Sequence, residues 1–254
     1  MVLTLPPAFY SDTHASRLSD KYVHVKTSEV LDVFQDHGWK ISAASSANRG
    51  KNQQHSRHLV RMRHSDYLEG FRADGVIPEL LVLNSHNGSW ALRMMLGMFR
   101  TVCANGMVAG SVWEGVTLKH YRLKDLEAKV QSATVSMSDH VHTLGNCIET
   151  WDKIELSAPQ QEEFATKARE IRWGAATPVE ASVLLEARRP EDTGTSLWKV
   201  FNRVQESLTQ GGFSGRTSNN HIMSVKGVKN VRRDFMYNKR LWELADNLSK
   251  EATA

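Results

Sequence analysis

From Lys124 onward, apolar residues recur every three or four positions, and this spacing constrains the fold more than any other feature of the sequence. The stripe runs through Leu126, Val130, Ala133, Met137, Val141, Leu144, Ile148 and Trp151. Such steps place these side chains on one face of a single long helix, which other parts of the chain must cover. Gly145 weakens this helix without ending it.

Further helices are predicted after the long one. Ser157 and Pro159 mark the start of a helix that runs through residue 171. The stretch Thr177-Pro178-Val179-Glu180 has the pattern of a capping box for a helix that ends near Ala187. A helix over 196–210 ends at two glycines, 211–230 is a connection rich in Gly, Ser and Asn, and the final helix covers about 234–250.

Before residue 124 the pattern changes to short apolar runs that are interrupted by Gly and Asn. A helix capped by Thr27 or Ser28 is predicted over 27–37, an exposed loop over 45–56, and strands over 39–43, 58–64, 79–84 and 112–121. Asn87-Gly88 is typical of a tight turn between strands. The following segment, 90–99, fits either a helix or a strand, and pairing across the turn favours the strand.

These elements predict an α+β protein in which an antiparallel sheet with a helix (residues 1–123) precedes a helical region (residues 124–254) packed on it. With 254 residues, 41% of them hydrophobic, the chain can bury a core, which excludes a disordered or small disulfide-stapled protein. Two cysteines cannot form a disulfide framework. Because the chain lacks a long apolar run and a leader-like start, we expect a cytoplasmic protein without a membrane segment.

Positive charge is concentrated in two parts of the sequence. Residues 38–64 contain six Lys and Arg with no acid, and residues 201–240 contain eight with two acids, whereas residues 125–170 carry a net charge of −5. Lys and Arg supply affinity for nucleic-acid phosphates, and aromatic side chains nearby stack on bases. Trp39, Phe235 and Tyr237 are either such platforms or core residues. The predicted phosphate-binding residues are Lys40, Arg49, Lys51, Arg57, Arg61, Arg63, Lys226, Lys229, Arg232 and Arg233.

The sequence favours no catalytic chemistry. His55, His58 and His64 lie on a predicted loop and strand without paired cysteines, so we expect surface or interface histidines rather than a metal site. Cys103 has no activating neighbour and is expected to be a buried hydrophobe. The sequence contains no P-loop, no Rossmann glycine motif, no HExxH and no GxSxG. We therefore predict no catalytic residues, no metal and no cofactor.

Three ordered segments resemble a known family. Residues 83–89 with 99–106 resemble the central block of a phage- and plasmid-borne family catalogued as domain of unknown function 932, 188–212 its downstream block, and 238–245 its C-terminal helix. The resemblance covers roughly residues 22–248. It implies a mobile-element protein with a role in phage or plasmid DNA metabolism inside a bacterium, and it implies no particular reaction. The order helix, strand, basic loop, strand and hairpin is also similar in outline to single-strand annealing proteins.

The leading hypothesis is a non-enzymatic nucleic-acid-binding protein that binds or anneals single-stranded DNA in recombination or replication and acts as a homo-oligomer. Two alternatives stay open. One is a protein-interaction module that uses its acidic segment, 125–170, to bind a host protein or to mimic DNA. The other is a metal-dependent nuclease.

Overall fold

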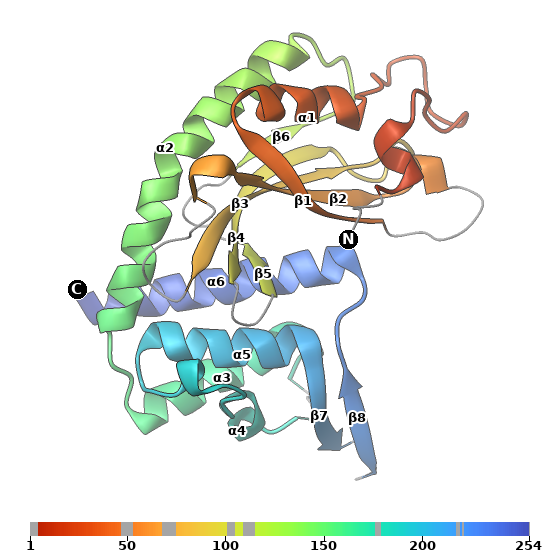
Figure 1. The fold of residues 1–254 in the computed structure, drawn as a ribbon. Coiled ribbons are helices and arrows are strands. Elements are labelled where there is room, and N and C mark those ends of the chain that lie inside the picture. Colours follow the sequence, from red (N-terminus) through yellow and green to blue (C-terminus); the bar gives the residue numbers. More distant parts are fainter. Residues whose placement is uncertain are drawn as a thin grey trace. The chain divides into compact units, whose positions relative to one another are not determined.

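The chain has an α+β fold that divides into two compact units (Figure 1). The computed structural model describes residues 5–46, 53–67, 75–100, 105–108, 115–175, 179–216, 219 and 221–253. Unit 1 contains Met1–Thr101 and Val112–Thr143, and unit 2 contains Val102–Ser111 and Leu144–Ala254. The long predicted helix is confirmed as α2 (Leu126–Lys153), and the limit between the units falls within it. The boundary predicted at residues 123 and 124 stays a prediction.

An antiparallel sheet forms the centre of unit 1. Strands β1, β2, β3 and β4 are neighbours in that order, β6 pairs with β4, and each of these pairs is antiparallel. Their bounds are β1 Trp39–Ser46, β2 His58–His64, β3 Val76–Asn84, β4 Leu92–Arg100 and β6 Val116–Leu118. All nine residues of β3 are buried, which is typical of a central strand covered on both faces. The strand predicted over 90–99 is confirmed as β4, and the candidate over 112–121 forms a strand at 116–118.

Helix α1 (Thr27–Asp36) packs against β1 through an apolar face (Figure 1). Val30, Leu31 and Phe34 are almost fully buried. The predicted cap was wrong, because Lys26 occupies the N-cap position and makes no side-chain capping bond. Thr27 is instead inside the first turn and fully buried, where its hydroxyl binds a histidine of β2. Short 3₁₀ turns flank the sheet at Pro7–Tyr10 (η1), Gln53–His55 (η2) and Ser65–Tyr67 (η3).

Unit 2 is mainly helical and has an aromatic core. Its elements are β5 Asn105–Val108, the end of α2, α3 Ala158–Trp173, α4 Ala181–Leu184, η4 Pro190–Asp192, α5 Leu197–Gln210, β7 Gly211–Arg216, β8 Ile222–Lys226 and α6 Val231–Thr253. The ring centroids of Trp151 and Trp242 lie 4.4 Å apart. The centroid of Phe201 lies 5.3 Å from that of Trp151 and 5.6 Å from that of Trp242. Trp198 stacks on Phe201 at 5.8 Å. These rings join α2, α5 and α6.

Two expectations about unit 2 were wrong. The helix predicted from Thr177 begins only at Ala181 and lasts four residues, while 176–178 lie outside the described residues. The connection predicted over 211–230 contains an antiparallel hairpin, β7–β8 (Figure 1). Gly211 ends α5 at φ +63°, and it lies so close to the carbonyl oxygen of Val225 that a side chain there would overlap β8. The glycine that predicted a helix end therefore also starts a strand.

No helix within the described ranges is both long enough and apolar enough to cross a membrane.

Candidate nucleic-acid interface

Segments from distant parts of unit 1 meet at one end of its sheet. The loop over 85–91 joins β3 to β4, and backbone hydrogen bonds connect it to two other segments. The N–H of Ala15 donates to the carbonyl oxygen of His86 at 2.9 Å, and the N–H of His86 donates to that of His55 at 3.2 Å. In the same part of the unit, the N–H of Val23 donates to the carbonyl of His120 at 2.6 Å. This end of the sheet is therefore built from chain positions about a hundred residues apart.

A buried hydrogen-bond network around Asn84 fixes this arrangement. Its amide group donates to the carbonyl of Val25 at 3.0 Å and to the Thr27 hydroxyl at 2.9 Å. Its oxygen accepts from the backbone N–H of Ser85 at 2.8 Å and from Nε2 of His120 at 2.9 Å. Every hydrogen-bonding position of the Asn84 side chain is thus used, so the network holds the end of β3 in one orientation.

His58 continues the network into β2. Its Nδ1 donates to the carbonyl of Ser56 at 2.9 Å, so Nε2 is the acceptor for the Thr27 hydroxyl at 2.7 Å. Burial lowers the pKa of His58 to about 4 and that of His86 to about 3. Both rings are therefore neutral near pH 7, and they hold the structure by directional hydrogen bonds instead of charge. The prediction of a surface or interface role was wrong for His58, which is fully buried.

Two cation–aromatic pairs lie at the surface of this sheet end. The guanidinium of Arg57 lies 5.6 Å from the centroid of Trp90, and its Nε donates to the Ser89 hydroxyl at 2.9 Å. The guanidinium of Arg122 lies 5.4 Å from the ring of Tyr121, which is 55% exposed. Both distances lie within the range of attractive cation–π contacts. We call Arg57, Trp90, Lys119, Tyr121 and Arg122 the sheet-end interface.

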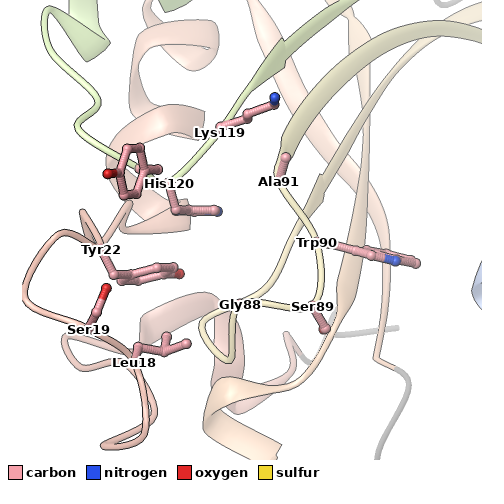
Figure 2. A pocket seen from close by; sticks show the side chains of 10 residues that line it. Leu18, Ser19, Tyr22, Gly88, Ser89, Trp90, Ala91, Lys119 and His120 are labelled. Atoms are coloured by element: carbon pink, nitrogen blue, oxygen red, sulfur yellow. The ribbon is translucent and has the colours of Figure 1, made fainter.

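A pocket of about 310 Å³ at this end of the sheet is lined in part by Trp90, Lys119 and Tyr121. Figure 2 shows the ring of Tyr22 beside His120 in this pocket, while the ring of Trp90 points away from them on the other side of the loop. Burial raises the pKa of Tyr22 to about 12, so its hydroxyl stays protonated and donates to the Ser85 carbonyl. The lining is mainly apolar, and Lys119 adds a positive charge to it. Such a pocket suits a planar ring that is attached to an anionic group.

The predicted cations of the first basic segment have different surroundings. Lys40 is exposed on β1, and Arg57 belongs to the sheet-end interface. Arg49 and Lys51 lie outside the described residues.

Arg61 and Arg63 are bound to a buried carboxylate. Nη1 of Arg61 lies 2.7 Å from Oε2 of Glu79, and Nε of Arg63 lies 2.8 Å from Oε1 of the same carboxylate. Glu79 is fully buried. The guanidinium of Arg63 also lies 3.7 Å from the centroid of Phe99. Residues 38–64 contain no acid, but the pairing of β2 with β3 brings Glu79 beside Arg63. These two cations therefore share a compensating charge that the local sequence does not reveal.

The predicted cations of unit 2 lie in one continuous stretch of chain. Lys226 ends β8, Lys229 follows it, and Arg232 and Arg233 lie in the first turn of α6; all four are exposed. The base of the hairpin is anchored by Arg172, whose guanidinium donates to the carbonyls of Leu208 and Lys226. Arg188 donates to the carbonyl of Gly211 at the same base. The hairpin is thereby attached to the C-terminal end of α5, where carbonyls lack helical partners.

The aromatic residues predicted beside these cations are mainly core residues. Trp39 is 1% exposed and Phe235 is 6% exposed, so neither is available to stack on a base. Tyr237 is half-buried. Trp90 and Tyr121 instead provide aromatic surface in unit 1, and sequence reasoning missed both. In the sequence, Trp90 could have been noticed because it closely follows the Asn87-Gly88 turn, and Tyr121 because it directly precedes Arg122.

Cys103 lies outside the described residues. Among the residues that the structure does describe, no cluster of three or more His, Cys, Asp or Glu side chains has an arrangement that would hold a metal ion.

Comparisons with known proteins give the family. Residues 14–242 match the family described as a domain of unknown function, DUF932. Two relatives from Escherichia coli strain K12, the UPF0380 proteins YfjQ and YafZ, are each 29% identical over 247 residues, which is 96% of this chain and 88% of each relative. No solved structure matches the chain. The resemblance of the three sequence blocks is confirmed, and the chain belongs to the DUF932 family.

Proposed function

We propose that this protein binds single-stranded nucleic acid at the sheet-end interface and serves a non-enzymatic role, such as strand annealing, in recombination or replication. The observation that carries the proposal is the pair of cation–aromatic contacts, Arg57 with Trp90 and Tyr121 with Arg122, whose aromatic residues both line one pocket. The pairs place phosphate-binding and base-stacking groups next to each other. That combination is typical of proteins that bind single strands.

The chemistry favours a single strand over a duplex. A base stacks on an aromatic side chain only when its own face is free, and the bases of a duplex already stack on one another. The rings of Trp90 and Tyr121 offer such faces, while Arg57, Lys119 and Arg122 supply positive charge for the backbone. Stacking does not read base identity, so the proposed binding is tolerant of sequence.

The exposed cations at the β7–β8 hairpin support the same proposal in a different way. Lys226, Lys229, Arg232 and Arg233 lie within eight consecutive residues and are all open to solvent. Such a group attracts phosphates without regard to sequence. We propose that it adds long-range attraction, that unit 1 supplies the stacking contacts, and that the protein acts as a homo-oligomer on a strand inside a bacterial cell.

The proposal is tested by fluorescence anisotropy with a labelled single-stranded oligodeoxynucleotide, the matching RNA and the matching duplex, from 50 to 300 mM salt. We expect single strands to bind more tightly than the duplex, and log Kd to rise linearly with log salt concentration because bound phosphates release counterions. Absence of binding at low salt, or an affinity that does not change with salt, would overturn the proposal.

Variants locate the binding surface. Trp90→Ala is expected to weaken binding by about 5- to 150-fold, since stacking one base contributes about 1–3 kcal/mol. Arg57→Gln is expected to reduce the salt slope by about 0.7, the value for one phosphate contact on a single strand. The matched control is Lys167→Gln on α3, because Lys167 is exposed but pairs with Glu163 at 2.7 Å. Equal losses in all three variants would count against a sheet-end interface.

A further inference from the structure

A second pocket, of about 470 Å³, adjoins the sheet-end interface in unit 1 and has a polar lining. We call it the histidine pocket. It is lined by His14, Ser16, Arg17, Gln54, His55 and Asn87, together with Ala15. None of these described lining residues is acidic. A polar pocket with a guanidinium and two imidazoles, and without a lining carboxylate, is suited to an anion.

The hydrogen bonds already present leave donors available for that anion. The side-chain oxygen of Asn87 accepts from the backbone N–H of Ser89 at 3.1 Å and from its hydroxyl, which leaves the amide NH₂ group of Asn87 as a donor. Arg17 uses one terminal nitrogen, which donates to the Asn87 carbonyl at 3.3 Å. A guanidinium has five N–H groups, so most of those on Arg17 remain for a ligand.

The two histidines each form a hydrogen bond with the segment over 13–15. Nδ1 of His14 lies 3.1 Å from the carbonyl oxygen of Ala15 and therefore donates to it. Nε2 of His55 lies 3.1 Å from the hydroxyl of Thr13, which accepts as readily as it donates. Burial, with the nearby rings of His14 and His24, lowers the pKa of His55. An anion bound beside the His55 ring would counteract this effect, because a nearby negative charge favours the protonated form of an imidazole.

The position of the histidine pocket relates it to the proposed interface. Both pockets are lined by the segment around 14–22 and by the loop over 85–91. Arg17 and Asn87 line the histidine pocket, and the next residue of each segment, Leu18 and Gly88, lines the apolar one. A site for a base and a site for an anion are therefore contiguous within one unit.

We infer that the histidine pocket binds the terminal phosphate monoester of a nucleic-acid strand, an inference that rests on the proposed function. A terminal monoester carries close to two negative charges near pH 7 and three acceptor oxygens, whereas an internal phosphodiester carries one charge. The larger charge and acceptor number match the guanidinium, imidazole and amide donors of this pocket. The protein would thereby prefer strands that end in phosphate, such as those left by nuclease cleavage.

The test compares three labelled oligonucleotides of one sequence, which carry a 5′-hydroxyl, a 5′-phosphate or a 3′-phosphate. Wild-type protein is expected to bind one phosphorylated form about tenfold more tightly than the hydroxyl form, as expected for one added hydrogen bond to a charged group. The 5′ and 3′ arms show which end is held. Equal affinity for all three strands overturns the phosphate site and leaves the proposed function standing. Failure of all three to bind overturns both.

Two variants assign the effect to this pocket. His55→Gln and the exposed Arg17→Gln are each expected to reduce the tenfold preference to about twofold or less, while the hydroxyl strand still binds and thereby shows that the variants are folded. His142→Gln is the matched control, since His142 is exposed on α2. A preference that persists in both pocket variants would overturn the assignment.

Discussion

Acidification is expected to destabilise the protein because His58 is buried in its neutral form. Its pKa is about 4 in the folded chain and 6.5 as the ordinary value, so the unfolded chain binds one more proton between these pH values. The free energy of unfolding therefore has its full His58 contribution above about pH 6.5 and loses it as the pH falls toward 4. A difference of about 2.5 pKa units corresponds to about 3 kcal/mol, lost at up to about 1.4 kcal/mol per pH unit.

The assay is urea unfolding followed by circular dichroism at intervals from pH 7.5 to 4. Other groups also titrate in this range, including His86, so the informative quantity is the difference between wild type and His58→Gln. The variant is expected to be less stable at pH 7.5 and to have a shallower loss of stability below pH 6.5. The exposed His142→Gln should follow the wild-type curve. Parallel curves for wild type and His58→Gln would mean that protonation of His58 does not cause the loss of stability.

Two substitutions test the packing. Glu79→Gln leaves Arg61 and Arg63 without their shared buried carboxylate. Urea unfolding should therefore show that the free energy of unfolding falls by about 3–5 kcal/mol. A decrease below about 1 kcal/mol would mean that this contact behaves as a surface ion pair. Gly211→Ala places a Cβ 2.5 Å from a backbone oxygen of β8 at φ +63°, whereas Gly174→Ala has a similar φ and no atom within 4 Å. The first should lower the thermal midpoint clearly more than the second, which carries only backbone strain of roughly 1–3 kcal/mol. Equal shifts would contradict the overlap.

Local patterns in the sequence were sufficient to predict most elements of the fold. The apolar spacing after Lys124 predicted α2, and the Asn87-Gly88 turn between apolar runs predicted that β3 pairs with β4. These features depend on residues near one another in the chain. The hairpin β7–β8 was missed because Gly and Ser are poor strand formers, and its base is held by Arg172 and Arg188 from elsewhere in unit 2.

The candidate site was less accessible to sequence reasoning because it depends on contacts between distant segments. The basic window around Arg61 contains no acid, yet a carboxylate from β3 neutralises part of it. The network around Asn84 joins residues separated by 36 to 59 positions, and no local pattern specifies it. Charge clustering made Arg57 a candidate for phosphate binding but did not reveal that Trp90 lies beside it.

The end of the sheet in unit 1 is the surface that we propose contacts a single strand. The most direct measurement is ultraviolet crosslinking to an oligonucleotide that contains 4-thiothymidine, followed by mass spectrometry of the tryptic peptides. We expect the main adducts on the peptides that contain Trp90 and Tyr121, and their loss when the corresponding unlabelled strand is added in excess. Adducts confined to unit 2, or adducts that persist against the competitor, would contradict the account.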